Sequence, residues 1–252
     1  MIRISEILMA TVIVWMEEVD SFFGPEVIGG PFFMKRKVIN YITQTAIFGG
    51  LAAILYCVPG LQFKIPFVAP GFMEIHLDEI PILISSFAYG PLLGIFEILL
   101  RTLIKLPMTS TMCVGELGDM MYSFALIIPA SYIYTKNRTF KGAIIGLSIG
   151  LIANLFFTSI VNLYTIFPLY KIILSMPDGA IAGAFDAIYK MGIVADNDVR
   201  IALLLLPFNL IRNGIVIATT MVCYKPLRFL LERIGSKFDK NKEKIDQDKN
   251  QE

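Results

Sequence analysis

Apolar residues in this sequence are concentrated in long runs separated by short polar segments. Runs of about 20 apolar residues match the thickness of the hydrocarbon core of a bilayer. The runs cover 38–57, 80–106, 117–134, 142–167 and 201–223. The run at 80–106 is interrupted by Gly90, Pro91 and Gly94, so it forms either one tilted helix or two short ones. The pattern predicts an all-α integral membrane protein.

Basic residues between the runs decide the number of crossings, because cytoplasmic loops of membrane proteins carry an excess of lysine and arginine. Three basic clusters flank the runs: Lys35, Arg36 and Lys37; Lys136, Arg138 and Lys141; Lys225, Arg228 and Arg233. All three lie on one side only if 80–106 crosses the membrane twice. We therefore expect six transmembrane helices, with both termini cytoplasmic and the acid-richer loops outside.

Composition excludes several classes of protein. The 252 residues are 56% hydrophobic and only 17% charged, with a mean hydropathy of +0.67. This composition argues against a soluble enzyme, a disordered regulator and a disulfide scaffold. The net charge of +1 gives no support to nucleic-acid binding. Three scattered cysteines and the lone His76 offer no metal site, and no phosphate-binding loop for ATP is present, so uphill transport would need another subunit or an ion gradient.

The two ends of the chain differ from the apolar middle. Residues 1–33 are rich in acids, and their apolar stretch is too short to span a membrane. We interpret Met34, directly before three basic residues, as the true start; the alternative is that 1–33 form an amphipathic interfacial segment. Residues 34–236 form the six-span domain, and 237–252 form a charged tail that we expect to be disordered.

Charged and amide residues inside the apolar runs indicate functional positions, because burying them in lipid is costly. Glu97, Arg101 and Lys105 share one helical face, which is consistent with an internal ion pair and a lysine reaching the interface, or with a ligand site. Three further polar residues, Asn209, Arg212 and Asn213, share a face of the last run and favour a polar cavity. A third group, near the outer end of the fifth span, comprises Asn154, Asn162 and Tyr164.

Small residues mark one face of the first run. Ala46 and Gly50 form one small-xxx-small pair, and Gly49 and Ala53 form a second. Such spacing lets another helix approach closely. The sequence leaves open whether that helix belongs to a partner or whether the pattern arises by chance.

Five motifs in order along the chain resemble the substrate-binding S components of energy-coupling factor (ECF) vitamin transporters, and most closely their riboflavin-specific branch. The motifs are DEIP at 78–81, FAYGP at 87–91, GELGD at 115–119, NLY at 162–164 followed by PLY at 168–170, and PFNLIR at 207–212. Three positions depart from the family pattern: His76 and Asp119 replace Asp and Asn, and Arg212 replaces Lys. Asp119 and Arg212 either compensate each other electrostatically or indicate a related but different ligand.

The resemblance implies a substrate-capture subunit in the plasma membrane that binds riboflavin as transported ligand, with no cofactor or metal. Its implied binding residues are Asn162, Asn209, Arg212, Glu116, Tyr164 and Asp119. The loop 61–79 is expected to form an outer lid. Ala46, Gly49, Gly50 and Ala53 correspond to the surface that contacts the transmembrane coupling subunit, which works with two cytoplasmic ATPase subunits.

Three alternatives stay open at this point. The ligand could be another water-soluble vitamin or precursor. The chain could instead be a small proton-coupled carrier that uses Glu97 and Arg101, or Glu116 and Asp119, as a relay, although it shows no inverted repeat. A membrane-embedded enzyme is disfavoured because no nucleophile motif accompanies His76.

Overall fold

A computed structural model describes residues 36–65, 67–71 and 73–249, and the interpretation of residues 1–33 lies outside these described residues. The described part is helical, with one isolated antiparallel bridge between Phe63 and Ile75, which confirms the all-α class. The elements in order are α2 (Arg36–Cys57), α3 (Glu79–Tyr89), α4 (Pro91–Lys105), the short 3₁₀ helix η2 (Leu106–Met108), α5 (Val114–Lys136), α6 (Phe140–Val161), the π-helical turn η3 (Asn162–Ile166), α7 (Phe167–Ile173), α8 (Ala180–Tyr189) and α9 (Val199–Lys249).

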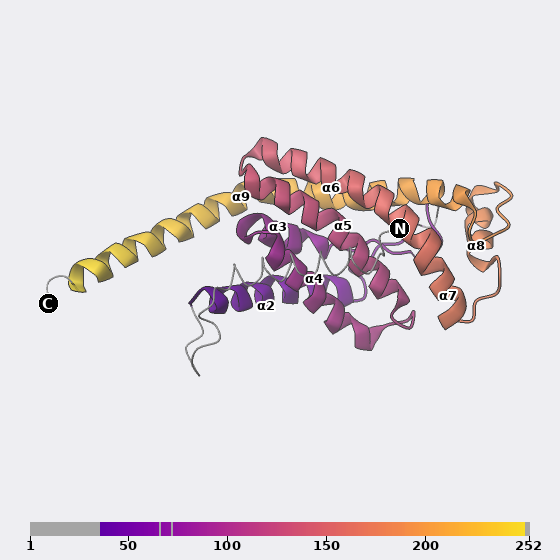
Figure 1. Ribbon diagram of the computed structural model, residues 1–252, viewed down its shortest axis with the longest axis horizontal. Helices are drawn as coiled ribbons and strands as arrows, with labels where there is room; N and C mark the ends of the chain where they lie inside the picture. The colour runs from indigo at the N-terminus through magenta and orange to yellow at the C-terminus, as the bar shows by residue number, and fades with distance from the viewer. Residues whose placement is uncertain (1–35, 66, 72, 250–252) are drawn as a thin grey trace, which may run out of the picture. The chain divides into compact units, whose positions relative to one another are not determined.

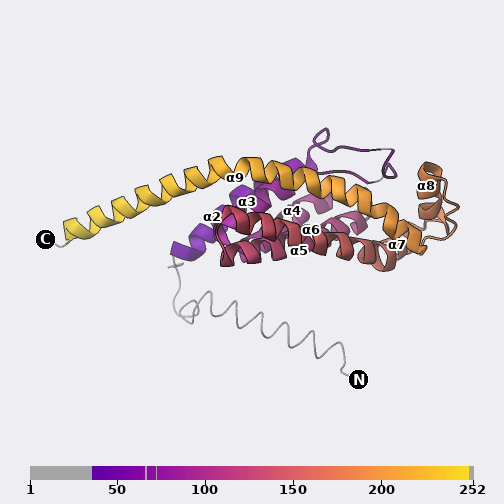
Figure 2. The same ribbon diagram turned by 90° about the horizontal axis from the view of Figure 1, so that it is seen from above.

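Two units make up the chain, one ending at Gln44 within α2 and one beginning at Thr45. The first unit contributes the helical turns 36–44 of α2. In the second unit α5 and α6 run side by side, and α9 packs along α3 and α6 (Figures 1 and 2). Helices α7 and α8 lie at the end of the bundle where α9 begins (Figure 1).

The long apolar stretch at 80–106 forms two helices, one of the two alternatives that its glycines and proline leave open. Gly90 joins α3 to α4 with a φ of 105°, a conformation that glycine adopts without steric cost, and Pro91 occupies the first turn of α4. At 1.5 Å per residue, α3 and α4 are about 16 and 22 Å long, shorter than a hydrocarbon core of about 30 Å.

Two stretches of the described chain are long and apolar enough to cross a membrane by themselves. They are Phe140–Ile173 and Val199–Tyr224, with mean hydropathies of 2.2 and 1.9. The count of six spans and the cytoplasmic position of both termini stay predictions.

The segments after residue 167 hold more helix than the sequence analysis expects. The stretch 168–200, which we expected to be a loop, continues the preceding helix to Ile173 and contains α8. Likewise α9 continues to Lys249, where a disordered tail from residue 237 was expected.

Glycines on α6 set the close packing of α5 against α6. A Cβ added at Gly146 would lie 2.5 Å from the carbonyl oxygen of Ala130, and one at Gly150 would lie 2.5 Å from that of Leu126. No side chain fits at such distances. The Gly-xxx-Gly spacing of these two residues therefore serves contact within the chain, a signal that the sequence analysis missed.

The small residues of α2 divide between two faces. A Cβ at Gly49 would lie 3.0 Å from Cδ2 of Leu100 in α4, and Ala53 is buried. Ala46 is exposed, and a Cβ at Gly50 would meet nothing within 4 Å. The expectation that all four residues contact a partner is therefore wrong for Gly49 and Ala53, because they pack inside the unit. Only Ala46 and Gly50 form an outward small-residue pair.

Candidate ligand-binding site

The described residues enclose a cavity of about 250 Å³ between the loop 61–79 and the helices α2, α4, α5, α7 and α9. This volume is close to the lower end of the roughly 300–1,000 Å³ range of small-molecule sites. The loop contributes Lys64, Gly71, Met73, Glu74 and His76 to the lining, as expected of a lid. The helices and their connections contribute Tyr56, Lys105, Ser110, Thr111, Gly115, Glu116, Asp119, Tyr122, Asn162, Ile166, Phe167, Tyr170, Phe208, Asn209 and Arg212.

Asn162 reaches the cavity at the π-helical turn that follows α6. Such turns are rare and occur frequently at functional sites. The Tyr122 hydroxyl donates to Oδ1 of Asn162 at 2.6 Å, and Nδ2 of Asn162 donates to the Thr158 carbonyl at 3.0 Å. These two bonds fix the orientation of the amide. Asn162 therefore has one N–H left with which to bind a ligand.

Asn209 also lines the cavity, on α9. Its side chain is buried, and its Nδ2 atom has no hydrogen-bond partner among the described residues. Buried polar groups in proteins are paired in the large majority of cases. An unpaired amide at a cavity wall is suited to bind a carbonyl or ring nitrogen of a ligand.

Glu116, at the start of α5, is held by two threonines of the α4–α5 connection. The hydroxyls of Thr109 and Thr111 donate to the same oxygen, Oε2, at 2.8 and 2.9 Å. The other oxygen, Oε1, is left to accept a hydrogen bond from a ligand N–H or hydroxyl. Both threonines lie outside any periodic pattern, so the sequence analysis missed their role.

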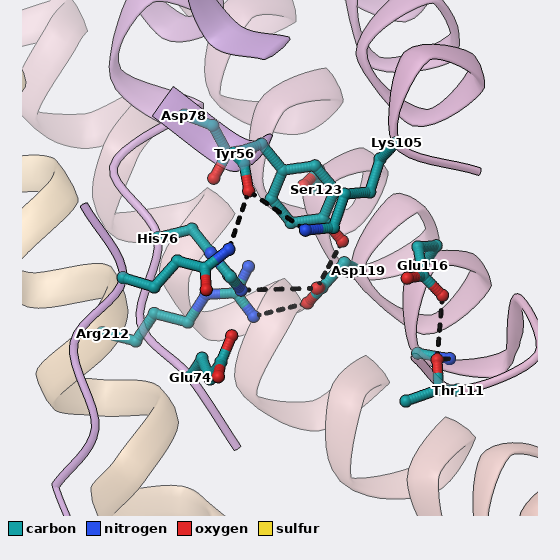
Figure 3. Close-up of polar contacts among 12 residues, drawn as sticks. Tyr56, Glu74, His76, Asp78, Lys105, Thr111, Glu116, Asp119, Ser123 and Arg212 are labelled. Carbon is teal, nitrogen blue, oxygen red and sulfur yellow. Dashed lines mark hydrogen bonds and ion pairs between the residues drawn. The ribbon is translucent and has the colours of Figure 1, made fainter. Parts of the chain in front are cut away.

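Asp119 and Arg212 form an ion pair in the cavity wall, with Nη1 of Arg212 3.0 Å from Oδ1 of Asp119 (Figure 3). Tyr56 donates to the other oxygen of Asp119 at 2.8 Å, and Nη2 of Arg212 lies 3.4 Å from Oε1 of Glu79. The electrostatic compensation of Asp119 and Arg212, one of the two alternatives from the sequence, is therefore confirmed. The wall offers polarity without a large net charge.

Arg101 completes the charged cluster behind this wall. It pairs with Asp78 at the start of α3, and it donates to Ser123 at 2.9 Å. The internal pair expected between Glu97 and Arg101 is absent from the ion pairs of the described residues, because Glu97 accepts from Ser85 instead. Helical periodicity placed the two residues on one face correctly, but partners on α3 and the loop before it bind them.

His76 projects from the lid toward the same cluster (Figure 3). Its ring meets the Tyr56 ring edge-on, with centroids 4.7 Å apart. Burial lowers the pKa of His76 to about 4; the Asp119 carboxylate opposes this shift, and nearby Arg212 adds to it. His76 is therefore neutral at pH 7.

Three residues from the two amide-containing groups, Asn154, Tyr164 and Asn213, do not belong to the cavity lining. Tyr164 is 69% exposed and does not belong to the cavity lining, so the structure does not bring it together with the other predicted binding residues. Its position within η3 turns the side chain outward. Asn213 donates to Asn154 at 2.6 Å within the helix packing, so of the three polar residues on α9 only Asn209 and Arg212 line the cavity.

A helical bundle with a cavity beneath a loop, lined by apolar side chains and polar ones, is the arrangement of a small-molecule binding protein. The family model of the ECF transporter substrate-specific component matches residues 40–224, and the chain belongs to this family. The family consists of transporter components that bind substrate, and it is not a family of enzymes.

Relatives in three bacteria are named riboflavin transporters. The chain is 28% identical to RibU of Staphylococcus aureus (strain TCH60), over 73% of this chain and 89% of the relative. It is 26% identical to FmnP of Bacillus subtilis (strain 168), over 70% and 86%. It is 25% identical to RibU of Streptococcus thermophilus, over 84% and 98%.

The fold also resembles a solved structure of the S component of a bacterial ECF transporter. The TM-score is 0.61 at 23% sequence identity, covering 77% of this chain and 98% of the solved chain. This likeness shows a shared fold.

Proposed function

We propose that this chain is the substrate-capture subunit of an ATP-driven importer in the plasma membrane and that its ligand is riboflavin. One observation carries the proposal: Asn162, Asn209, Arg212 and Glu116, which lie up to 96 residues apart in sequence, line one cavity. The names of the relatives support riboflavin among the vitamins.

The chemistry of the cavity suits a flavin. Riboflavin has a flat ring with an imide edge and an uncharged polyol tail. The cavity provides apolar walls from Ile166, Phe167 and Phe208. Amide donors suit the ring carbonyls, and the remaining oxygen of Glu116 suits a hydroxyl or the imide N–H. The ion pair in the wall adds no large net charge, as a neutral ligand requires.

Flavin fluorescence tests this proposal directly. Wild-type protein in detergent is expected to quench riboflavin fluorescence on binding. Asn209→Ala leaves a ligand group unpaired, at a cost of roughly 1–3 kcal/mol, or about 5- to 150-fold weaker binding. The matched control is Tyr164→Ala, which removes an exposed side chain outside the cavity and is expected to bind as wild type does. Absence of binding by the wild-type protein would contradict the proposal.

The coupling to the transmembrane subunit and its two ATPases is assigned to the outward face of α2. The exposed Ala46 and the open position at Gly50 allow a second helix to approach. Gly50→Leu is expected to leave riboflavin binding by the isolated subunit unchanged and to abolish uptake by the complex. Gly49→Leu is expected to impair both, because Gly49 faces Leu100 within the chain. Uptake that survives Gly50→Leu would overturn this assignment.

A further inference from the structure

His76 lies in the lid between two residues, Ile75 and Asp78, that are fixed by interactions with the rest of the chain. On one side Ile75 exchanges two backbone hydrogen bonds with Phe63, at 2.7 and 3.0 Å. On the other side Asp78 forms a buried ion pair with Arg101. The imidazole is therefore presented at a defined position in the cavity lining, although it lies in a loop.

The imidazole has unused hydrogen-bonding capacity. His76 is 5% exposed, and its buried Nδ1 has no hydrogen-bond partner among the described residues. Its Nε2 lies 3.9 Å from Oδ2 of Asp119, beyond hydrogen-bonding distance. Asp119 is already satisfied by Tyr56 and Arg212. An imidazole that the surrounding chain does not satisfy is suited to a partner that arrives with the ligand.

The charges around the ring define the chemistry of that partner. The groups that face His76 are Tyr56 on α2, Arg101 and Lys105 on α4, Asp119 on α5 and Arg212 on α9. Burial is the main cause that lowers the pKa of His76; the Asp119 carboxylate opposes it and the three cations add to it, so the imidazole is neutral at pH 7. A neutral imidazole carries one N–H donor and one acceptor. It therefore pairs with an uncharged donor or acceptor group.

We propose that His76 is a specificity-determining residue of the lid, which hydrogen-bonds an uncharged polar group of the ligand in the cavity that Asn209 also lines. The inference rests on the proposed function and deepens it: for a flavin, the group is either a ribityl hydroxyl or the polar edge of the ring. A lid residue that hydrogen-bonds a polar group of the ligand selects against molecules of similar shape that lack this group.

Two variants of His76 separate a ligand contact from a structural role. His76→Phe keeps a ring against Tyr56 but removes both nitrogens, and His76→Gln keeps an amide donor and acceptor. We expect His76→Phe to weaken riboflavin binding roughly 5- to 100-fold and His76→Gln to recover at least part of the loss. The melting temperature of the ligand-free protein is expected to stay unchanged or to rise in His76→Phe, because a buried unpaired nitrogen is removed.

A second ligand locates the contact. Lumiflavin shares the ring of riboflavin but carries a methyl group in place of the ribityl chain. A loss in His76→Phe for riboflavin alone supports a ribityl contact, and an equal loss for both flavins supports a ring contact. If His76→Phe and wild type bind riboflavin equally, the inference about His76 is overturned and the proposed function is not. A parallel loss of melting temperature and affinity that His76→Gln does not restore has the same consequence. A wild-type protein that binds neither flavin overturns the proposed function and this inference together.

Discussion

Two buried polar clusters each contribute side chains to the cavity lining and differ in kind. One, the amide ladder, comprises Tyr122, Asn154, Thr158, Asn162 and Asn213. The other, the ionic cluster, comprises Asp78, Glu79, Arg101, Asp119 and Arg212. The ladder joins α5, α6 and α9 through neutral groups, whereas the ionic cluster joins the end of the lid to α4, α5 and α9.

The clusters also differ in how completely their groups are paired. In the amide ladder, Asn213 donates to Asn154 at 2.6 Å, and Asn154 donates to the Tyr122 carbonyl at 2.7 Å. In the ionic cluster, Oε2 of Glu79 and the Nε atoms of Arg101 and Arg212 have no hydrogen-bond partner among the described residues. A fully paired network favours one structure. We infer that the ladder is structural apart from the remaining N–H of Asn162 at the cavity, whereas the ionic cluster can rearrange when a ligand or the lid supplies the missing partners.

The largest expected effect comes from breaking the ionic cluster at Arg101. Arg101→Met leaves the Asp78 carboxylate buried without its partner, and breaking a buried pair costs roughly 3–5 kcal/mol. We expect a large loss of melting temperature in detergent, with or without ligand. The control is Lys105→Met on the same helix, whose side chain is less buried and makes one bond of 3.4 Å to the Tyr56 carbonyl. Similar melting temperatures for the two variants would contradict the assignment.

Breaking the amide ladder is expected to have a smaller effect, and this effect is on folding stability and not on riboflavin affinity. Asn213→Ala removes the 2.6 Å bond to Asn154 and leaves a buried oxygen with one weak partner, Thr158 at 3.3 Å. The cost is roughly 1–3 kcal/mol of folding free energy. Riboflavin affinity is expected to change less than about twofold, because Asn213 does not line the cavity. Asn209→Ala is expected to show the reverse pattern, and a loss of affinity in both variants would remove the distinction.

The positions of the polar residues could be predicted from the sequence, but their roles could not. Burying a charge or amide in lipid is costly, so Asn162, Asn209, Asn213 and Arg212 stand out in apolar runs whatever they do. Whether an amide lines a cavity or bonds another helix depends on which residues the other helices bring opposite it. Asn209 and Asn213 lie one turn apart and differ in this respect.

Ion-pair partners and the environment of small residues also depend on which helices lie opposite, so the sequence does not predict them. Arg101 has Glu97 one turn away but pairs with Asp78, which only the fold of α3 against α4 brings near. Gly49 and Gly50 are adjacent in sequence, yet one faces Leu100 and the other faces open space. The helices themselves, and the break at Gly90, could be predicted because they depend on local sequence.

The smallest expected effect is a dependence of stability on pH through His76, which lies beside the ionic cluster. Folding lowers the pKa of His76 from 6.5 to about 4, chiefly through burial. Above pH 6.5 neither the folded nor the unfolded protein protonates His76, so this residue contributes no dependence there. Between pH 6.5 and 4 the unfolded chain binds a proton that the folded protein excludes, so stability falls as the pH falls. Lowering the pH from 6.5 to 5.5 costs about 1 kcal/mol through this residue.

Melting temperatures of the ligand-free protein at pH 7.5, 6.5 and 5.5 measure this contribution. Wild type is expected to lose stability between pH 6.5 and 5.5, and His76→Phe to lose less over the same interval, because it has no imidazole to protonate. Asn213→Ala is expected to be less stable than wild type at every pH but to keep the wild-type slope, because the amide ladder holds no group that titrates in this range. An equal slope in wild type and His76→Phe would show that His76 does not bring pH dependence to the ionic cluster. A flattened slope in Asn213→Ala would show that the two clusters are energetically coupled, and the division between a structural and an adaptable cluster would then fail.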